Sequence, residues 1–417
     1  MLNPDRQTDI GFRLNSVICD KPARSDVTYT ASRNSRKGCD RCCVTGNYVN
    51  RRMVFKDVNS CRRTDNSFRS KEGADYHHGT SVFERLPIDM VKIFPLDYMH
   101  LVCLGVVRRQ LGIWLRLAKQ RQFRLSNETI ACINERLQAA ESCITKDFQR
   151  KCRSLEFLQF WKATECRLFL MYLGPVVLHD LLPSPLYANF LRLFTSVYIL
   201  CHPRYHLKLC DSVKQQLKQY VLCFDSLYPD ELVYNVHALQ HLAGDVCEHG
   251  CLDTFSAFPY ESHLCQIKGR VMSGFRVAKQ VASREVERCV FASSTNAGKS
   301  PAELTPPCVT VYLAKQSFCV GKTYYSTVSP DRFVVVNGVP GIICGVGEGN
   351  LFKFTPCLDK QPFFKKPFES TKLDIYKSGQ FSGDTEWVAI NTIKYKCIAI
   401  PTNHFNVFIP MPHTSAR

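Results

Sequence analysis

The sequence predicts an α+β protein with a large helical middle and a small β-rich domain towards its C-terminal end. Apolar residues recur at helical spacing from about residue 84 to residue 249. A small, polar and Pro-rich stretch at 291–307 has the composition of a linker. Beyond it the apolar period changes to two, and Asn337-Gly338 separates two such runs, which is a strong hairpin signal. These observations predict a helical region, a linker and a β domain at 308–417.

The composition describes a globular protein that favours polyanionic partners. Its 417 residues are enough for two or three domains, and 45% of them are hydrophobic while 22% are charged. The net charge of +17 favours nucleic acid over other partners. No stretch approaches the roughly 20 apolar residues of a membrane span, and the N-terminal residues carry charges where a signal peptide is apolar. We therefore expect a DNA partner, no membrane association, no secretion, and a location in the nucleus or alternatively the cytoplasm.

Cysteine is abundant, but its distribution does not predict a disulfide scaffold. The 22 cysteines are scattered through a long chain without a secretion signal, so most are expected to be reduced core residues. Only Cys39 and Cys42 have the C-x-x-C spacing of metal ligands. Cys43 is a formal alternative to Cys42, although the two-residue gap is the one that lets both sulfurs converge on one ion.

The N-terminal region is predicted to be a strand followed by a basic, irregular segment. Residues 13–20 have the pattern of a short strand that ends at Asp20, with a turn around Pro22. We assign 1–33 to this strand region. Residues 34–83 are basic and lack a long apolar period, so a bound metal would help to order them.

The helical middle is predicted to consist of several helices separated by proline-containing breaks. Asp97 is the expected N-cap of the first strong helix, and a helix from about Val233 carries His237 and His241 and ends near Gly250. The other predicted helices span 127–142, 155–173, 185–201 and 206–227. The predicted segments are a helical insertion at 84–232 and a region at 233–290 that holds the histidine-bearing helix and a helix with Glu261.

Two cysteines and two histidines form a complete set of zinc ligands. On a helix, His237 and His241 lie four residues apart and project from one face, so both can bind one ion. Together with Cys39 and Cys42 they complete a Cys2His2 tetrahedron, which is closed and therefore structural. His77, His78 and His100 compete for the histidine half of this predicted site.

Two acidic residues flank these ligand pairs and are candidate ligands of catalytic metal ions. Asp20 precedes Cys39, and Glu261 follows His241 at nearly the same separation. Two-metal phosphoryl transfer uses acids from separate elements to hold two Mg²⁺ ions about 4 Å apart. Each acid also has an ordinary interpretation, Asp20 as a turn residue before Pro22 and Glu261 as a first-turn helix acid. Asp97 is a rival acid for which helix capping is the favoured role.

Basic residues near the metal ligands and in the helical region are candidate phosphate contacts. The alternative for each is a solvated surface position. The candidates are Arg51, Arg52, Arg62, Arg63, Arg108 and Arg109. Gly345-x-Gly347-x-Gly349 is followed by neither a helix nor a Lys-Ser/Thr pair, so it is interpreted as a loop and not as a phosphate cradle.

Several motifs in a fixed order resemble those of transposase-derived proteins related to CACTA (En/Spm-like) DNA transposons. The motifs are Val17-Ile-Cys-Asp-Lys-Pro-Ala-Arg24, Gly38-Cys-Asp-Arg-Cys-Cys-Val-Thr-Gly46, Arg63-Thr-Asp-Asn-Ser-Phe68 with His77-His78, Phe94-Pro-Leu-Asp-Tyr-Met-His-Leu-Val-Cys-Leu-Gly105 and Leu252-Asp-Thr-Phe-Ser-Ala-Phe-Pro-Tyr-Glu261. The resemblance covers roughly residues 13–290. The C-terminal β segment is also similar to the tail of animal members of this group.

The resemblance implies an RNase H-like DDE transposase core that a helical insertion interrupts. It implies that Asp20 is the second and Glu261 the third catalytic acid. The order of motifs is also similar to that of the V(D)J recombinase core, in which the equivalent cysteines and histidines bind zinc. The first acid of such a core has no counterpart here, so we expect a partial, N-terminally truncated core of one residual strand and a C-terminal helix.

The leading functional prediction is therefore a transposase-derived protein, ancestrally a Mg²⁺-dependent DNA nuclease and strand transferase, that is inactive in this chain. Zn²⁺ is its expected structural cofactor and Mg²⁺ its ancestral catalytic one, with DNA as the partner and homo-oligomerisation as a further expectation. One alternative is a domesticated, zinc-stabilised DNA- or protein-binding module. The other is an unrelated helical interaction protein, which predicts no zinc.

Overall fold

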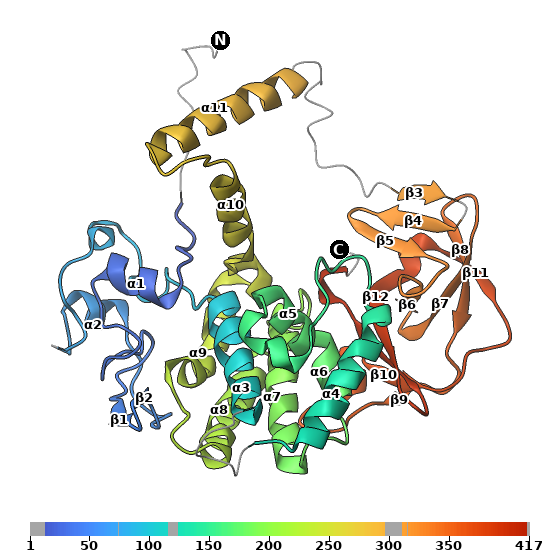
Figure 1. The fold of residues 1–417 in the computed structure, drawn as a ribbon, viewed down its shortest axis with the longest axis horizontal. Helices are drawn as coiled ribbons and strands as arrows, with labels where there is room; N and C mark the ends of the chain where they lie inside the picture. The colour runs from blue at the N-terminus through green and yellow to red at the C-terminus, as the bar shows by residue number, and fades with distance from the viewer. Residues whose placement is uncertain (1–12, 74, 116–123, 297–310, 315, 415–417) are drawn as a thin grey trace. The chain divides into compact units, whose positions relative to one another are not determined.

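The computed structural model describes residues 13–73, 75–115, 124–296, 311–314 and 316–414, and the chain divides into two compact units (Figure 1). Unit 1 comprises Met1–Leu101 and Arg204–Ser256, and unit 2 comprises Val102–Pro203 and Ala257–Arg417. The fold is mixed, with a helical middle and a β-rich C-terminal region, as the sequence predicts.

The boundaries of these units differ from the predicted segments 84–232 and 233–290. α8 (Cys210–Leu227) and α9 (Tyr234–His249) belong to unit 1 with the N-terminal residues, whereas α10 (Phe258–Gly269) belongs to unit 2. Long-range contacts explain the difference: Arg41 forms a buried salt bridge of 2.9 Å with Asp245 of α9. Helical periodicity predicts where helices form, but it does not predict which distant segments are joined by such salt bridges.

The predicted strand at 13–20 is wrong. The Val17 amide donates to the Ile93 carbonyl at 2.7 Å, and Cys19 forms a single parallel bridge with Leu96. α1 (Lys21–Thr28) then begins directly after Asp20, whose Oδ1 accepts a hydrogen bond from the Ala23 amide at 2.8 Å. An aspartate N-cap followed by a proline in the first turn favours helix initiation, and this local signal replaces the predicted turn.

Unit 1 combines short N-terminal elements with a long helical hairpin. Thr64 caps α2 (Asp65–Arg69) in a capping box, and Asn50 (φ 47°) and Arg51 (φ 63°) form the left-handed turn of a tight β-hairpin. The remaining elements of unit 1 are β1 (Asn47–Val49), β2 (Arg52–Val54), α2 (Asp65–Arg69), η1 (Val82–Arg85) and η7 (Leu252–Phe255).

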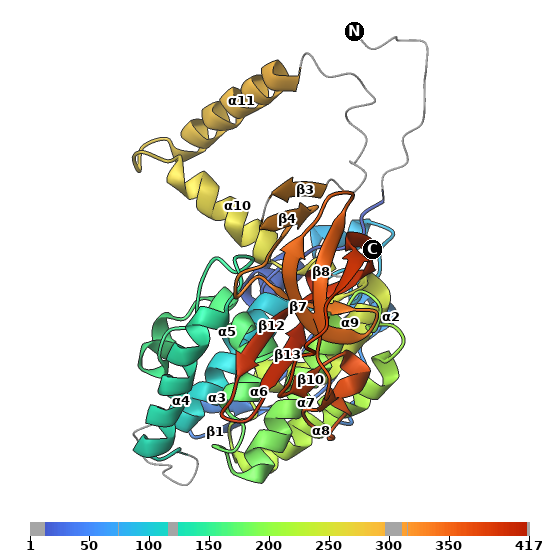
Figure 2. The ribbon, with the colours of Figure 1, turned by 90° about the vertical axis from the view of Figure 1, so that its right-hand side faces the viewer.

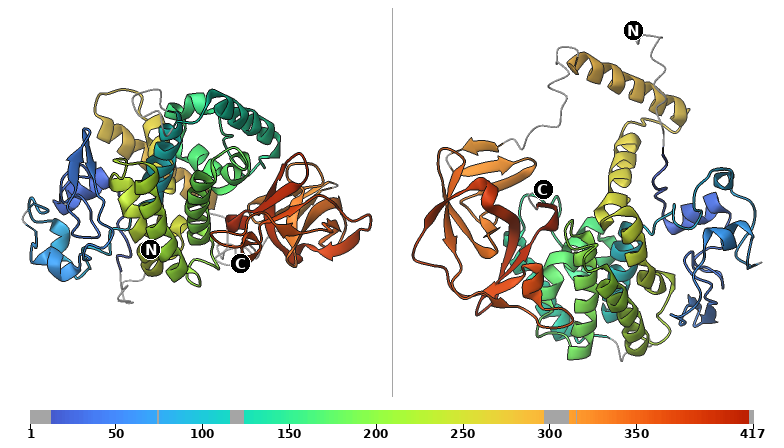
Figure 3. Two further views of the ribbon diagram at one scale, coloured as in Figure 1. Left: turned by 90° about the horizontal axis from the view of Figure 1, so that it is seen from below. Right: turned by 180° about the vertical axis from the view of Figure 1, so that it is seen from behind.

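Helices α8 and α9 lie side by side and form the centre of unit 1 (Figure 3). α8 buries one face through Leu217, Val221 and Phe224, which follow helical spacing, and its other face is exposed. α9 is buried over most of its circumference, including His237 and His241. Side chains on α9 can therefore meet the N-terminal segment away from solvent.

The helical part of unit 2 follows the predicted helices closely, with one difference. The prediction at 155–173 is a single helix, but the structure breaks it at Trp161 into η5, α5 and η6. The elements are η2 (Met99–Val107, a π-helix entered from unit 1), α3 (Arg108–Leu115), α4 (Asn127–Ala139), η4 (Ala140–Cys143), η5 (Leu155–Phe160), α5 (Ala163–Leu168), η6 (Phe169–Leu173), α6 (Gly174–Val177) and α7 (Ser184–Cys201). Among the described helices, none is both long and apolar enough to cross a membrane.

Two further helices of unit 2 follow η7 in the sequence. α10 has Pro259 in its first turn, and α11 (Val277–Asn296) continues to Asn296. The first six residues of the predicted linker at 291–307 are therefore helical, because the helix does not end where small residues begin. The rest of that linker lies outside the described residues.

The C-terminal β region contains a three-stranded and an eight-stranded antiparallel sheet (Figure 2). Asn337 and Gly338 form the predicted hairpin turn, with φ of 50° and 80°. The first sheet is β3 (Val311–Ala314), β4 (Ser317–Val320) and β5 (Thr323–Ser326). The second has the order β11-β8-β7-β6-β12-β13-β10-β9, with β6 (Phe333–Val336), β7 (Val339–Val346), β8 (Leu351–Pro356), β9 (Gln361–Pro362), β10 (Tyr376–Ser378), β11 (Glu386–Ala389), β12 (Ile393–Pro401) and β13 (Asn406–Pro410).

A buried lysine joins this sheet to the helical part of unit 2. The Lys396 ammonium lies 2.6 Å from a carboxylate oxygen of Asp147 and 2.6 Å from one of Asp331, and its side chain is fully buried. We expect Lys396→Met to lower the free energy of unfolding by about 3 kcal/mol, because two carboxylates lose their counter-charge. Urea unfolding measures the change, with exposed Lys365→Met as the control. Equal losses in both variants would contradict a structural role for this ion pair.

Candidate metal centre

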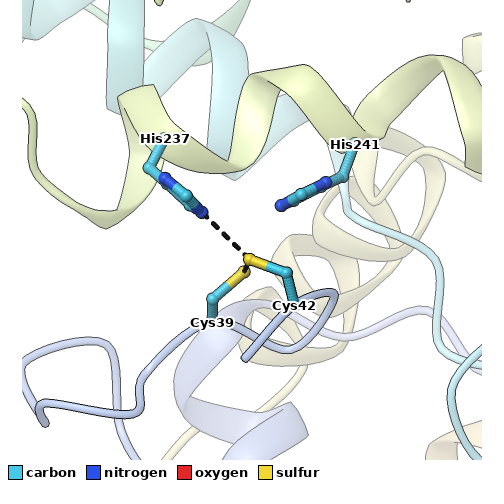
Figure 4. A group of neighbouring side chains, drawn as sticks. All are labelled: Cys39, Cys42, His237 and His241. Carbon is cyan, nitrogen blue, oxygen red and sulfur yellow. Dashed lines mark hydrogen bonds between the residues drawn. The ribbon is translucent and has the colours of Figure 1, made fainter. Parts of the chain in front are cut away.

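Four buried side chains from two distant parts of the chain converge in unit 1 (Figure 4). Cys39 and Cys42 come from the irregular segment between α1 and β1, and His237 and His241 project from α9. Their possible ligand atoms all lie within 4.8 Å of one another. Cys42 Sγ lies 3.3 Å from His237 Nε2 and 3.5 Å from Cys39 Sγ. The structure thus brings together the four residues that the sequence predicts as zinc ligands.

Local contacts orient these side chains before any ion binds. The Arg41 amide points at Cys39 Sγ at 3.5 Å, as expected of the tight C-x-x-C turn. On α9, the two histidines share a face because four residues complete about one helical turn. His237 Nδ1 lies 3.1 Å from the Phe55 carbonyl, which can only accept, so Nδ1 carries the proton and the Nε2 lone pair faces the sulfurs.

The protonation states also suit metal binding. Burial raises the pKa of the Cys39 thiol, but the hydrogen bond from Cys42 and the nearby histidines outweigh it, so the net pKa falls well below its usual value. The same hydrogen bond, with burial, raises the pKa of Cys42. Burial lowers the pKa of His241, which favours the neutral imidazole that a ligand needs. The hydrogen bond from Cys42 therefore favours the thiolate form of Cys39, which is the form in which a cysteine binds a metal ion.

The dimensions and an unsatisfied atom fit a zinc ion. Zn–S bonds of about 2.3 Å and Zn–N bonds of about 2.0 Å in a tetrahedron place ligand atoms roughly 3.3–3.8 Å apart. The observed separations of 3.3 and 3.5 Å lie near this range. His241 Nε2 is buried and has no hydrogen-bond partner, which an ion would supply. Two thiolates and two imidazoles leave no open position, so the bound ion would be structural.

The competing ligands suggested by the sequence are placed elsewhere. The His77 ring packs edge-on against Phe68, with 4.8 Å between centroids, and His100 Nδ1 lies 2.6 Å from an Asp97 carboxylate oxygen. The His78 amide donates to the Tyr29 carbonyl. The Cys43 amide donates a backbone hydrogen bond to the Cys61 carbonyl at 2.9 Å. None of these residues belongs to the converging group, which is the one such cluster among the described residues.

A buried carboxylate, Asp40, lies inside the C-x-x-C motif and is not among the predicted site residues. Asp40 accepts hydrogen bonds from Lys21 at 2.5 Å, Arg24 at 3.0 Å and the Tyr234 hydroxyl at 2.8 Å. Burial raises the Asp40 pKa, but Lys21 and Arg24 outweigh burial and lower it. Asp40 therefore ties α1 and α9 to the cysteine turn, and the charged Cys-Asp-Arg-Cys sequence is the signal that could have revealed it.

A second buried carboxylate fixes the same turn from α9. Asp245 pairs with Arg41, and its Oδ2 accepts the Leu96 amide at 2.7 Å. Arg41 also donates to the Phe94 carbonyl at 2.8 Å and to the Val91 carbonyl. Both buried networks involve a residue between Cys39 and Cys42, so the metal centre is held by ion pairs as well as by its ligands.

Most of the predicted phosphate-contacting arginines make contacts within the protein. Arg63 is buried, donates to the Cys39 carbonyl and stacks 3.5 Å from the Tyr76 ring centroid. Arg52 pairs with the buried Glu231.

Two more of the predicted arginines also make intramolecular contacts. Arg62 contacts His241 Nδ1 although its side chain is exposed, and Arg108 donates to the Trp161 carbonyl. Arg109 is half-buried in α3, whereas Arg51 is exposed at the hairpin turn. Of the six predicted residues, Arg51 has the placement that most favours a phosphate contact.

The three candidate acids have different settings. Asp20 and Asp97 directly follow the bridged residues Cys19 and Leu96 in unit 1, so they occupy neighbouring positions. Asp97 is buried and caps η2 by accepting the Met99 and His100 amides. Glu261 lies in unit 2, exposed in the first turn of α10.

Comparison with known proteins adds one family match. Residues 348–412 match the model of a domain of unknown function (DUF8592). No curated protein and no solved structure matches the chain. The matched residues span β8 to β13 and include none of the four residues of the metal centre. The description of the family assigns no activity.

Proposed function

We propose that this chain is a transposase-derived DNA-binding protein whose N-terminal surface is organised by a structural zinc ion. The buried Cys2His2 cluster carries the proposal, because it joins a basic N-terminal segment to α9 across about two hundred residues of sequence. The motif order that resembles CACTA transposases and the net charge of +17 support it. An RNase H-like ancestry belongs to this proposal, and the nucleus is the corresponding site of action.

The DNA-contacting surface that we propose is the knuckle face, defined as Arg33, Arg36, Lys37, Arg51 and the aromatic Tyr48. The three arginines are exposed, and Tyr48 is 72% exposed. Two contacts place Arg36 and Lys37 beside the start of β1: the Gly46 amide donates to the Arg36 carbonyl, and the Lys37 ammonium donates to the Thr45 hydroxyl. Arg51 lies in the turn at the other end of the same hairpin, and none of these cationic residues is a metal ligand.

Salt-dependent binding tests this function. We expect duplex DNA to bind with an affinity that falls steeply with salt, and we expect Arg36→Ala combined with Arg51→Ala to reduce the log–log slope by about two. Fluorescence anisotropy across a salt series measures this slope. Lys214→Ala is the control, because Lys214 pairs with Asp211 on α8. Absence of binding at low salt would exclude the proposal.

The catalytic part of the ancestry has a separate test. We expect no Mg²⁺-dependent or Mn²⁺-dependent cleavage of transposon-end DNA, since Asp20 Oδ1 is engaged as the cap of α1. Cleavage that disappears in Glu261→Gln would show that the acids still act, and the protein would then be an active nuclease. The alternative of an unrelated helical interaction protein predicts no bound zinc, so metal analysis separates it from both.

A further inference from the structure

Trp387 lies exposed on the edge strand of the eight-stranded sheet, in a setting that holds its ring in place. Its side chain is 55% exposed, whereas Trp114 and Trp161 are buried. A Cβ on Gly347 would lie 2.7 Å from Trp387 Cζ3 and 3.2 Å from Cη2, so the indole rests directly on the glycine backbone. This contact explains the glycine at position 347, whereas a Cβ on Gly345 would lie at an ordinary 4.0 Å from Trp387.

The backbone of Trp387 faces the open side of the sheet. Within the described chain, β11 has a strand neighbour, β8, on one side and ends the sheet order on the other (Figure 1). Trp387 is paired with Lys353, and the Ile390 amide donates to the Asn350 carbonyl at 2.9 Å. Because hydrogen-bonded and non-hydrogen-bonded pairs alternate in an antiparallel ladder, the amide and carbonyl of Trp387 point away from β8. An incoming strand could pair with both groups.

The charge of this edge is opposite to that of the chain as a whole. Residues 378–393 contain Asp384 and Glu386 and neither lysine nor arginine, in a protein with a net charge of +17, although Lys353 of β8 pairs with Trp387 and adds one cation beside them. Glu348 directly follows the glycine on which the indole rests. An exposed indole face attracts cations, and adjacent carboxylates strengthen that preference.

We propose that the β11 edge docks an extended, positively charged peptide segment by strand addition, with a lysine or arginine side chain over Trp387. The main-chain groups of Trp387 supply pairing, and the indole with Asp384 and Glu348 supplies preference for the cationic side chain, whereas Glu386 projects from the opposite face of β11. Because Gly347 has no side chain, the indole can lie directly against the backbone at this position. This site is independent of the metal centre and of the proposed DNA contacts.

A short capped peptide that alternates threonine and lysine is the probe. Titration into the full chain is expected to give a saturable blue shift of the exposed tryptophan emission, since Trp114 and Trp161 are buried. With a dye-labelled peptide, anisotropy is expected to show about a tenfold or greater loss of affinity in Trp387→Ala, as for a central aromatic anchor. Gly347→Ala retains the tryptophan but displaces its ring, and it should also weaken binding. Val328→Ala, at an exposed apolar position elsewhere, is the matched control and should bind as the unmodified chain does.

Four outcomes overturn the proposal. Equal affinity for the same peptide with glutamate in place of lysine removes the charge preference, and equal affinity for a backbone N-methylated peptide removes strand addition. Unchanged affinity in Trp387→Ala removes the anchor. If single-stranded DNA changes the Trp387 emission at a lower concentration than the peptide does, the indole stacks on nucleobases instead.

Discussion

Replacing Cys39 with serine is expected to abolish zinc binding and to lower the free energy of unfolding by at least about 5 kcal/mol. The unmodified chain is expected to bind about one zinc ion, as measured by elemental analysis of the purified protein. The ion joins the cysteine turn to α9, so its loss leaves His237 and His241 buried without a ligand partner. Chelation should have the same effect, and zinc should be released as pH falls because its ligands must be deprotonated.

Cys61→Ser provides the control for this experiment. Cys61 is exposed and lies beside Cys43, close to the metal centre but outside the converging group. This variant should retain zinc and unfold like the unmodified chain. Zinc retention in Cys39→Ser, or equal zinc loss in both variants, would contradict the assigned ligand set.

Asp40→Asn is expected to destabilise the protein by about 3–5 kcal/mol although its shape is nearly unchanged. The substitution removes the charge that compensates Lys21 and Arg24, whose side chains are 6% and 4% exposed. A buried cation without a counter-ion is costly because water cannot solvate it. Zinc affinity should fall by about 10-fold to 100-fold as well, since Asp40 positions the cysteine turn. Denaturant unfolding of the zinc-loaded protein and competition with a chelator measure the two effects.

Asp26→Asn is the matched control for Asp40→Asn. Asp26 lies on α1, between Lys21 and the end of the helix, and it is exposed. Its substitution should change the free energy of unfolding by less than about 0.5 kcal/mol. If the two variants are equally stable, the buried network does not support the metal centre.

The predictable parts of the site depend on local spacing. The C-x-x-C turn and two histidines one helical turn apart each orient a ligand pair, whatever the intervening chain does. Asn337-Gly338 likewise predicts its hairpin, because both residues tolerate the left-handed backbone of a tight turn. The prediction at 13–20 fails because an extended pattern becomes a strand only if neighbouring strands pair with it, and one bridge to Leu96 is the pairing that forms.

The sequence by itself determined the four candidate ligands, the helical middle and the β-rich C-terminal region, since these follow from residue spacing and from the change of apolar period. Only the tertiary structure decided which histidines meet the cysteines, that Asp40 and Asp245 are buried beside them, and that Trp387 rests on Gly347. It also decided that Arg52 and Arg63 hold the fold together and are not free for DNA. Burial and long-range pairing create these properties, and the local sequence pattern specifies neither of them.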